Sequence, residues 1–172
     1  MRDRSDPLAT SVGEGFEDFY AREFPGVVGL AYALSGNRAI AEDLAQEAFL
    51  AAHRRWGTVG RYDEPGAWVR RVVSNLSVSA FRRRVVEAKA LGRIGRDETT
   101  LPELTADDLE FWRAVRSLPR RQAQVVALFY LEDRPVAEVA VILDMAPGTV
   151  KKHLHDGRRA LARRLSIDEE EP

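Results

Sequence analysis

Apolar residues recur at helical spacing along most of this 172-residue chain, and no convincing run shows the alternation of a strand. In the first half, the pattern predicts one or two helices over residues 16–34 with a break near Pro25. A second helix is predicted over 39–56, and a third begins at Pro65 and ends near residue 84. The glycine-rich segment between the last two predicts a loop.

The second half is helical in pattern as well. Thr105-Ala106-Asp107-Asp108 resembles a capping box that starts one helix, and another helix follows Pro119. A short helix over 135–143, a tight turn and a basic helix over 147–165 complete the chain. Residues 86–105 contain two glycines and a proline and predict a flexible linker.

Two of the predicted helices carry apolar stripes that we expect to face a core. On the 39–56 helix the stripe is Ile40, Leu44, Ala48, Ala52 and Trp56. On the 65–84 helix it is Trp68, Val72, Leu76 and Ala80.

These elements predict an all-α fold of two small helical domains, each of a viable size, joined by the linker. The expected divisions are a flexible N-terminus over 1–13, a first domain over 14–85, the linker over 86–105, a second domain over 106–166 and an acidic tail over 167–172.

Charge changes the picture because it is distributed unevenly. The chain has 26 Lys and Arg against 27 Asp and Glu, a formal net charge of −1. Residues 68–84 nevertheless hold five arginines and no acid, and residues 113–164 hold eleven basic and five acidic side chains. Two basic segments indicate contact with a polyanion at two places, although solvated helix faces explain the charges equally well.

Composition excludes several classes of protein. The chain has no cysteine, which rules out a disulfide framework, a thiolate metal site and a cysteine nucleophile. His153 and His155 point to different sides of one helix and His53 lies far away in sequence, so we expect no metal. No phosphate-binding loop, zinc-protease motif or serine-hydrolase motif occurs, so we expect no cofactor, no catalytic residue and no enzyme.

The chain begins with charges that no apolar run follows, and nowhere does an apolar run approach the roughly 20 residues that span a bilayer. We therefore expect a soluble, cytoplasmic protein with no membrane insertion.

The last two helices have the layout of a helix-turn-helix, whose second helix enters the major groove of DNA. Val150 and Leu154 would anchor that helix. The side chains expected to face duplex DNA are Thr149, Lys151, Lys152, His153, His155 and Arg158. An ordinary helical hairpin with a solvated face is the alternative.

The 65–84 helix has a polar face that suits a nucleic acid. An amide among guanidinium groups can bind a base edge while the arginines neutralise phosphates. The residues on this face are Arg71, Asn75, Ser79, Arg82, Arg83 and Arg84. Upstream, Trp56 and Tyr62 could stack on unpaired bases, although Trp56 also fits a core position.

The 39–56 helix combines acids with large apolar side chains away from its inner stripe. The residues are Asp43, Gln46, Glu47, Phe49 and Leu50. This combination indicates a contact with another protein, unless Phe49 and Leu50 complete a wide apolar stripe.

Four motifs in order resemble one family. They are Asp43-Leu44-Ala45-Gln46-Glu47-Ala48-Phe49-Leu50, then Ala67-Trp68-Val69 with Asn75-Leu76 and Arg82-Arg83, then Leu118-Pro119-Arg120-Arg121-Gln122, and finally Gly148-Thr149-Val150-Lys151. Together, and over residues 16–165, they resemble the extracytoplasmic-function (ECF) sigma factors of bacterial RNA polymerase.

The resemblance implies sigma region 2 in the first domain and sigma region 4 in the second. It implies that Asp43, Gln46 and Glu47 bind core RNA polymerase and that the Asn75 helix captures the melted strand of the proximal promoter element. The helix-turn-helix would recognise the distal element as duplex, and an anti-sigma factor is a further implied partner. The chain departs from the family pattern at Ser79, Asp144, Ala146, His153 and Asp156.

Two functions therefore compete: a sigma factor and a standalone helix-turn-helix DNA-binding regulator. Asp43, Gln46 and Glu47 beside Asn75 favour the sigma factor, because a simple regulator has no need of that combination. An enzyme such as a metal-dependent nuclease is disfavoured by the missing ligand clusters.

Overall fold

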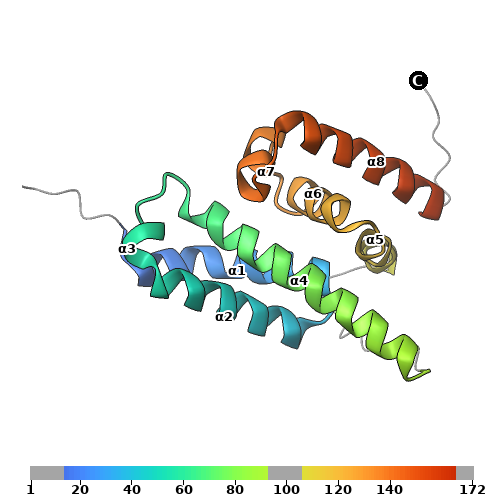
Figure 1. Cartoon of the computed structure of the whole chain (residues 1–172), viewed down its shortest axis with the longest axis horizontal. Coiled ribbons are helices and arrows are strands. Elements are labelled where there is room, and N and C mark those ends of the chain that lie inside the picture. Colours follow the sequence, from blue (N-terminus) through green and yellow to red (C-terminus); the bar gives the residue numbers. More distant parts are fainter. Residues whose placement is uncertain (1–13, 93–105, 166–172) are drawn as a thin grey trace, which may run out of the picture.

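Eight helices and no strand make up residues 14–92 and 106–165, the ranges that this computed structural model describes (Figure 1). They are α1 (Phe16–Ser35), α2 (Arg38–Arg54), α3 (Trp56–Val59), α4 (Pro65–Ala90), α5 (Ala106–Arg116), α6 (Arg120–Tyr130), α7 (Val136–Leu143) and α8 (Pro147–Leu165). The all-α prediction is confirmed. Within the described ranges, none of these helices combines the length and apolar character needed to cross a bilayer.

The first unit, residues 14–92, is built around α1, which packs against both α2 and α4. The predicted break near Pro25 is wrong, because Pro25 lies inside one continuous helix. Proline lacks an N–H and usually kinks a helix. Here Phe19 and Val27, on either side of it, have no exposed surface, and this packing holds the helix together through the proline.

Helix α4 differs from its prediction in length and in its buried face. It ends at Ala90, so residues 86–90 are helical and not linker. Val69 and Val73 are fully buried, whereas Trp68 and Val72 are only partly buried. Ala80 is buried as predicted, but the rest of the buried face includes the residues next to the predicted stripe, because α4 is covered from two sides, by α1 and α2 and by α6 and α7.

The second unit, residues 106–165, packs α8 across α5, α6 and α7. The helix-turn-helix is present as α7, a turn and α8. Val150, Leu154, Gly157 and Leu161 form the buried stripe of α8. In the turn, Asp144 has φ 53°, a left-handed conformation that normally favours glycine.

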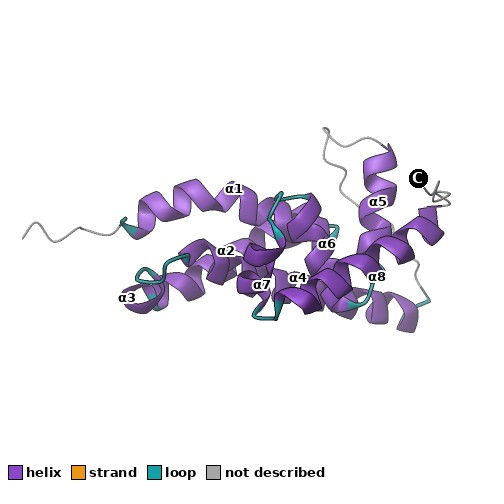
Figure 2. Cartoon of the chain, turned by 90° about the horizontal axis from the view of Figure 1, so that it is seen from above, coloured by secondary structure: helices purple, strands orange, loops and turns teal. Residues whose placement is uncertain are grey.

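The two units pack directly against each other, which nothing in the sequence pattern predicts. Helix α4 of the first unit contacts α7 and α6, and α1 contacts α5 and α6 (Figure 2). The predicted N-terminal segment, the Thr105 cap, most of the predicted linker and the acidic tail lie outside the described residues.

Gly157 provides a test of the packing inside the second unit. A Cβ atom at this position would lie 3.0 Å from Cγ2 of Val126. We expect Gly157→Val to lower the free energy of unfolding by about 1–3 kcal/mol, because the added methyl groups separate α8 from α6. Gly148→Val is the control on the same helix, since a Cβ there meets nothing within 4 Å. Equal stability of the two variants in urea denaturation would contradict this packing.

Candidate partner and nucleic-acid interfaces

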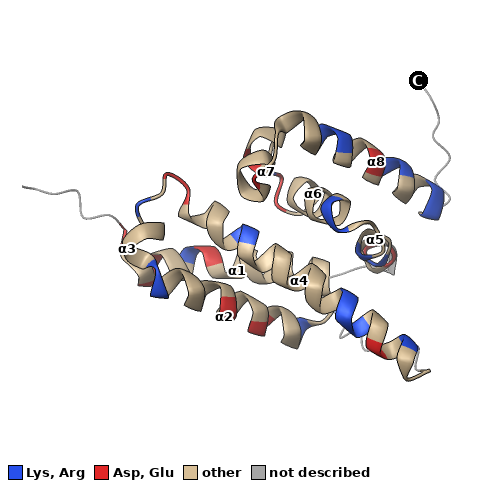
Figure 3. Ribbon diagram, viewed as in Figure 1, with Lys and Arg blue, Asp and Glu red and all other residues tan. Residues whose placement is uncertain are grey.

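One face of α2 is polar and open to solvent. The N-terminus of α2 is capped by Asn37, whose side chain accepts a hydrogen bond from the N–H of Ile40 at 3.0 Å. Exposed residues on the helix include Asp43, Gln46, Glu47 and Leu50. Acidic segments recur along α2 in Figure 3, and Leu50, in the same part of the helix, is 49% exposed. Four of the five residues predicted to contact a protein are therefore accessible.

Phe49 is the exception, and its prediction as a contact residue is wrong. Its side chain is only 1% exposed. The ring lies 4.9 Å from that of Tyr20 and 5.8 Å from those of Phe19 and Phe24, measured between centroids. Phe49 therefore belongs to a wide apolar stripe on α2, the alternative to a protein contact that the sequence left open. Leu50 does not belong to that stripe.

The different burial of Phe49 and Leu50 predicts different effects of their substitution on stability. Phe49→Ala should lower the free energy of unfolding by about 3–5 kcal/mol, because it leaves a cavity among three aromatic rings. Leu50→Ala should change it by no more than about 0.5 kcal/mol, because that side chain is half exposed. Urea denaturation of both variants checks this, and similar losses would place Leu50 in the core as well.

The arginine-rich end of α4 is accessible in part. Ser79, Arg82 and Arg83 are exposed. Arg84 instead donates a hydrogen bond to the carbonyl of Ser35 at 3.1 Å, at the C-terminal end of α1. It thereby satisfies a carbonyl that the end of a helix leaves without an intrahelical partner.

Arg71 and Asn75, in the middle of α4, are held by the second unit. Arg71 donates to the carbonyls of Ile142 and Val141 at 2.8 and 3.0 Å. The Oδ1 atom of Asn75 accepts hydrogen bonds from Arg120 at 2.6 Å and from Gln124 at 2.9 Å. These partners lie 45 to 71 residues away in sequence, so no local pattern reveals them.

The two aromatic residues before α4, Trp56 and Tyr62, differ in burial. Trp56 is half-buried, with its ring 5.2 Å from that of Phe16 and 4.9 Å from that of Phe19. This packing supports the core alternative for Trp56. Tyr62 is 46% exposed in the loop before α4.

The outer face of α8 presents most of the residues expected on duplex DNA. Thr149, Lys151, Lys152, His155 and Arg158 are exposed and His153 is half-buried. Two of the six are engaged within the unit. Lys152 donates to Asp156 at 2.8 Å, and Arg158 donates to the hydroxyl of Tyr130 at 2.6 Å. The hydrogen bond from Lys152 lowers the pKa of Asp156, so this carboxylate stays ionised to a lower pH than an ordinary aspartate.

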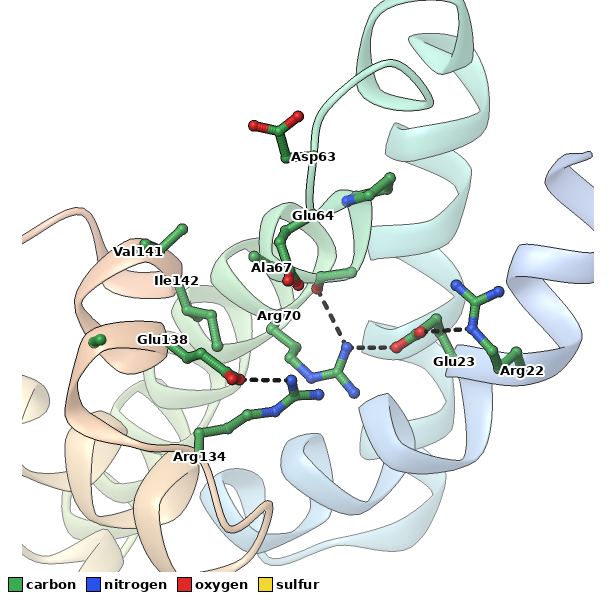
Figure 4. Close-up of a pocket in the computed structure, with 13 residues that line it drawn as sticks. Arg22, Glu23, Asp63, Glu64, Ala67, Arg70, Arg134, Glu138, Val141 and Ile142 are labelled. Atoms are coloured by element: carbon green, nitrogen blue, oxygen red, sulfur yellow. Dashed lines mark hydrogen bonds and ion pairs between the residues drawn. The ribbon is translucent and has the colours of Figure 1, made fainter. Parts of the chain in front are cut away.

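A buried arginine, Arg70, joins the two units. The sequence pattern indicates it only as one of the five arginines of residues 68–84. The side chain of Arg70 is 7% exposed. Its Nε lies 2.5 Å from Glu132 of the second unit, and its Nη1 lies 2.6 Å from Glu23 of α1. Beside this cluster is a cavity of about 340 Å³, which Arg134 and Glu138 line from the other side (Figure 4).

The charges in this cluster reinforce one another. Burial acts to raise the pKa of Glu23, but hydrogen bonds and attraction from Arg70 and Arg22 outweigh it, so the pKa of Glu23 lies below its ordinary value. Burial likewise acts to lower the pKa of Arg70, and the carboxylates of Glu132 and Glu23 raise it overall. Glu23 and Arg70 are therefore both charged at neutral pH.

Glu23 makes stability depend on pH in a predictable direction. A carboxyl with a lowered pKa stabilises the folded state above its unfolded pKa, and this contribution is lost as the pH falls through the folded pKa. The free energy of unfolding should therefore decrease below about pH 4.3, the ordinary value for a glutamate. Urea denaturation between neutral and acidic pH should show a smaller decrease in Glu23→Gln, and an identical decrease would contradict the assignment.

Metal-ligating side chains do not gather anywhere in residues 14–92 and 106–165. No group of three His, Asp or Glu in these ranges has the geometry to hold a metal ion.

Comparison with known proteins agrees with this architecture. Residues 19–86 match the family model described as Sigma-70 region 2, and residues 108–161 match Sigma-70, region 4. The ECF RNA polymerase sigma factor SigW of Bacillus subtilis is 29% identical over 151 residues, which span 79% of this chain and 81% of SigW. The RNA polymerase sigma factor CarQ of Myxococcus xanthus is 30% identical over 160 residues, 86% of this chain and 87% of CarQ.

A solved structure has the same fold. It is the sigma factor RpoE of Bartonella quintana, crystallised with the anti-sigma factor NepR. RpoE is 22% identical to this chain, and the superposition covers 90% of this chain and 98% of that one with a TM-score of 0.70.

With both sigma regions in order on an all-helical framework, the chain belongs to the sigma-70 class of transcription initiation factors. Within that class it is a member of the ECF sigma factors. Family membership decides between the two functions that the sequence left open, in favour of the sigma factor over the standalone regulator.

Proposed function

We propose that this sigma factor binds core RNA polymerase through α2, captures a melted promoter strand on α4 and reads duplex DNA with α8. The observation that supports this most is the row of Asp43, Gln46, Glu47 and Leu50 on α2. These side chains are exposed although the core behind them is closed by Phe49. Leu50 adds exposed apolar area that a purely solvated helix face does not require.

Contact with polymerase through this row would combine two effects. Carboxylates attract a basic partner and set the orientation of the complex. Leu50 supplies apolar area that becomes buried on binding, which drives association.

Capture of the melted strand would fall to α4 and the loop before it. Turning a base out of the stack costs a few kcal/mol, which a preformed partner must recover. The amide of Asn75 has both a donor and an acceptor that suit a base edge, and a base would have to replace Arg120 and Gln124 at its Oδ1 atom. Tyr62 offers a ring on which a base can stack, and Arg82 and Arg83 offer charge to the phosphates. Duplex recognition would use the exposed face of α8, with Thr149 and Lys151 near its N-terminus.

An anti-sigma factor is a further proposed partner. The RpoE structure with the same fold was solved with such a protein bound. A partner of this kind would silence the factor by covering α2, α4 or both.

Two substitutions separate polymerase binding from promoter opening. Asp43→Arg should abolish co-elution with bacterial core polymerase on a sizing column, because it reverses a charge at the N-terminal end of the α2 row. Asn75→Ala should leave co-elution intact and reduce opening of promoter DNA by about tenfold or more, as expected from the loss of an amide–base contact. The promoter would be selected from a random library by the wild-type complex.

Glu42→Arg is the matched control for Asp43→Arg. It makes the same charge change one residue away, where Glu42 pairs with Arg38 along the helix at 2.9 Å. Normal assembly of Asp43→Arg, or equal loss in both variants, would contradict the α2 interface.

A further inference from the structure

One acid lies on the helix to which we assign duplex DNA. Helix α8 carries six lysine and arginine side chains and a single carboxylate, Asp156. In Figure 3 this carboxylate is the acidic band among the basic segments of α8. Because a carboxylate is repelled by phosphates, attraction to DNA gives no reason for an acid at this position.

We propose that Asp156, together with Lys152, reads one C·G base pair of the distal promoter element, with the carboxylate on the amino group of cytosine and the ammonium on guanine. The inference deepens the proposed function of α8 and rests on it. It gives a role in specificity to an acid that the sequence pattern indicated only as a departure from the family.

Both side chains lie on the side of α8 that faces away from the core. Val150, Leu154 and Gly157 belong to the buried stripe of the helix. Successive residues of an α-helix are rotated by about 100°, which places Lys152 opposite this stripe and Asp156 one turn further along the same side. The side chain of Lys152 is 74% exposed and that of Asp156 is 33% exposed. Since the outer side of such a helix enters the major groove, both side chains can meet base edges.

The ion pair of Lys152 and Asp156 contributes little to the stability of α8. The two residues are one turn apart on a helix surface, where such pairs add little to stability. Here the base precedes the acid, which is the less favourable order in the field of the helix dipole. Folding therefore explains the acid no better than attraction to phosphate does, and this favours a role in base recognition.

The hydrogen-bonding groups of the ion pair match those of a C·G base pair. Nζ of Lys152 donates to Oδ2 of Asp156 at 2.8 Å, so a donor lies beside an acceptor. At the major-groove edge of the base pair, the N4 amino group of cytosine is hydrogen-bonded to O6 of guanine, and these two atoms are about 2.9 Å apart. The ion pair and the base pair are thus complementary in chemistry and in spacing.

The other base pairs suit these side chains less well. The N6 donor of adenine lies beside its N7 acceptor, which repels a carboxylate, and O4 of thymine lies beside a methyl group. Guanine instead offers O6 and N7 together, and the ammonium of Lys152 has three donors to reach them. Because the acid and the base occupy fixed places along α8, reversal of C·G to G·C exchanges donor and acceptor and is disfavoured as well.

Asp156 is held in the ionisation state that this contact requires. Cytosine offers a donor, so the carboxyl group must be ionised if both of its oxygens are to act as acceptors. The hydrogen bond from Lys152, reinforced by charge on His155 and His153, lowers the pKa of Asp156. Within the part of the chain that the structure describes, no hydrogen bond reaches its Oδ1 atom, which is left for the base. Arg159 is exposed close by and supplies positive charge for a neighbouring phosphate.

The test measures which base pairs the complex with core polymerase accepts. The wild-type complex selects a distal element from a random duplex library, and its affinity is then compared among four duplexes that differ only at the selected C·G position. We expect a preference for C·G of at least about fivefold over the other three base pairs, the low end for a direct base contact. Asp156→Ala should reduce this preference to within about twofold.

Asp156→Asn gives a second readout, because it should create a new preference. An amide pairs with N6 and N7 of adenine, so the preferred base pair at this one position should change from C·G to A·T. If Lys152 and Asp156 read the same base pair, the double variant Lys152→Ala with Asp156→Ala should lose no more preference than Asp156→Ala alone.

Glu138→Gln is the matched control. Glu138 also forms an ion pair with a base four residues before it, Arg134 at 2.9 Å, and its side chain is 45% exposed, but it lies on α7. The substitution removes the same charge from the same unit and should leave the four relative affinities unchanged. Melting followed by circular dichroism establishes that each variant is folded.

A carboxylate that only repelled phosphate would give a different result. Asp156→Ala would then tighten binding to all four duplexes equally and leave their ratios unchanged, which would overturn the proposal. Loss of the same preference in Glu138→Gln, or selection of a distal element with no C·G preference that depends on Asp156, would overturn it as well. Failure of the proposed function is distinguishable from these outcomes, because the wild-type chain would then not co-elute with core polymerase or its complex would select no duplex sequence.

Discussion

The guanidinium of Arg70 is the group on which the arrangement of the molecule depends. It is buried, and it reaches a carboxylate from α1 on one side and a carboxylate from the loop before α7 on the other. A buried charge is tolerated only when its partners are present, so α1, α4 and the second unit constrain one another through this residue. Once α4 is fixed between them, its next polar positions, Arg71 and Asn75, necessarily face α7 and α6.

Arginines in this chain often act as caps for helices to which they do not belong. The C-terminal end of α1 has no basic residue in its last turn. Its carbonyls accept hydrogen bonds from Arg84 of α4, at Ser35, and from Arg116 of α5, at Ala33. The basic segment of α4 that indicated nucleic acid is therefore divided, with Arg70, Arg71 and Arg84 engaged internally and Arg82 and Arg83 facing solvent.

The local sequence pattern was sufficient to predict the helices and turns, which depend on residues close together in the sequence. The helical spacing predicted every long helix, and the turn at residues 144–146 was predicted between α7 and α8. The pattern did not predict features that depend on contacts with distant segments of the chain. Most of the stripe on α4 was displaced because the helix is covered twice, and Pro25 was mistaken for a break because packing on both sides of it was not visible. The residues predicted to bind partners on α2 and α8 are exposed, apart from the buried Phe49 and the half-buried His153. The pairing of Asn75 with Arg120 joins residues 45 positions apart, and no periodicity encodes it.

The contact between the units also has a consequence for synthesis of the chain. The first unit contains α1 to α4 and all of their mutual contacts, so it can form before α5 to α8 have left the ribosome. Translation of the remaining segment takes on the order of ten seconds at bacterial rates of about 5–20 residues per second. During that interval α6 and α7 do not cover Arg71 and Asn75, and Glu23 is the one carboxylate that the first unit offers to Arg70. The nascent first unit is therefore a short-lived species with its basic helix uncovered, and completion of the C-terminal helices ends that exposure.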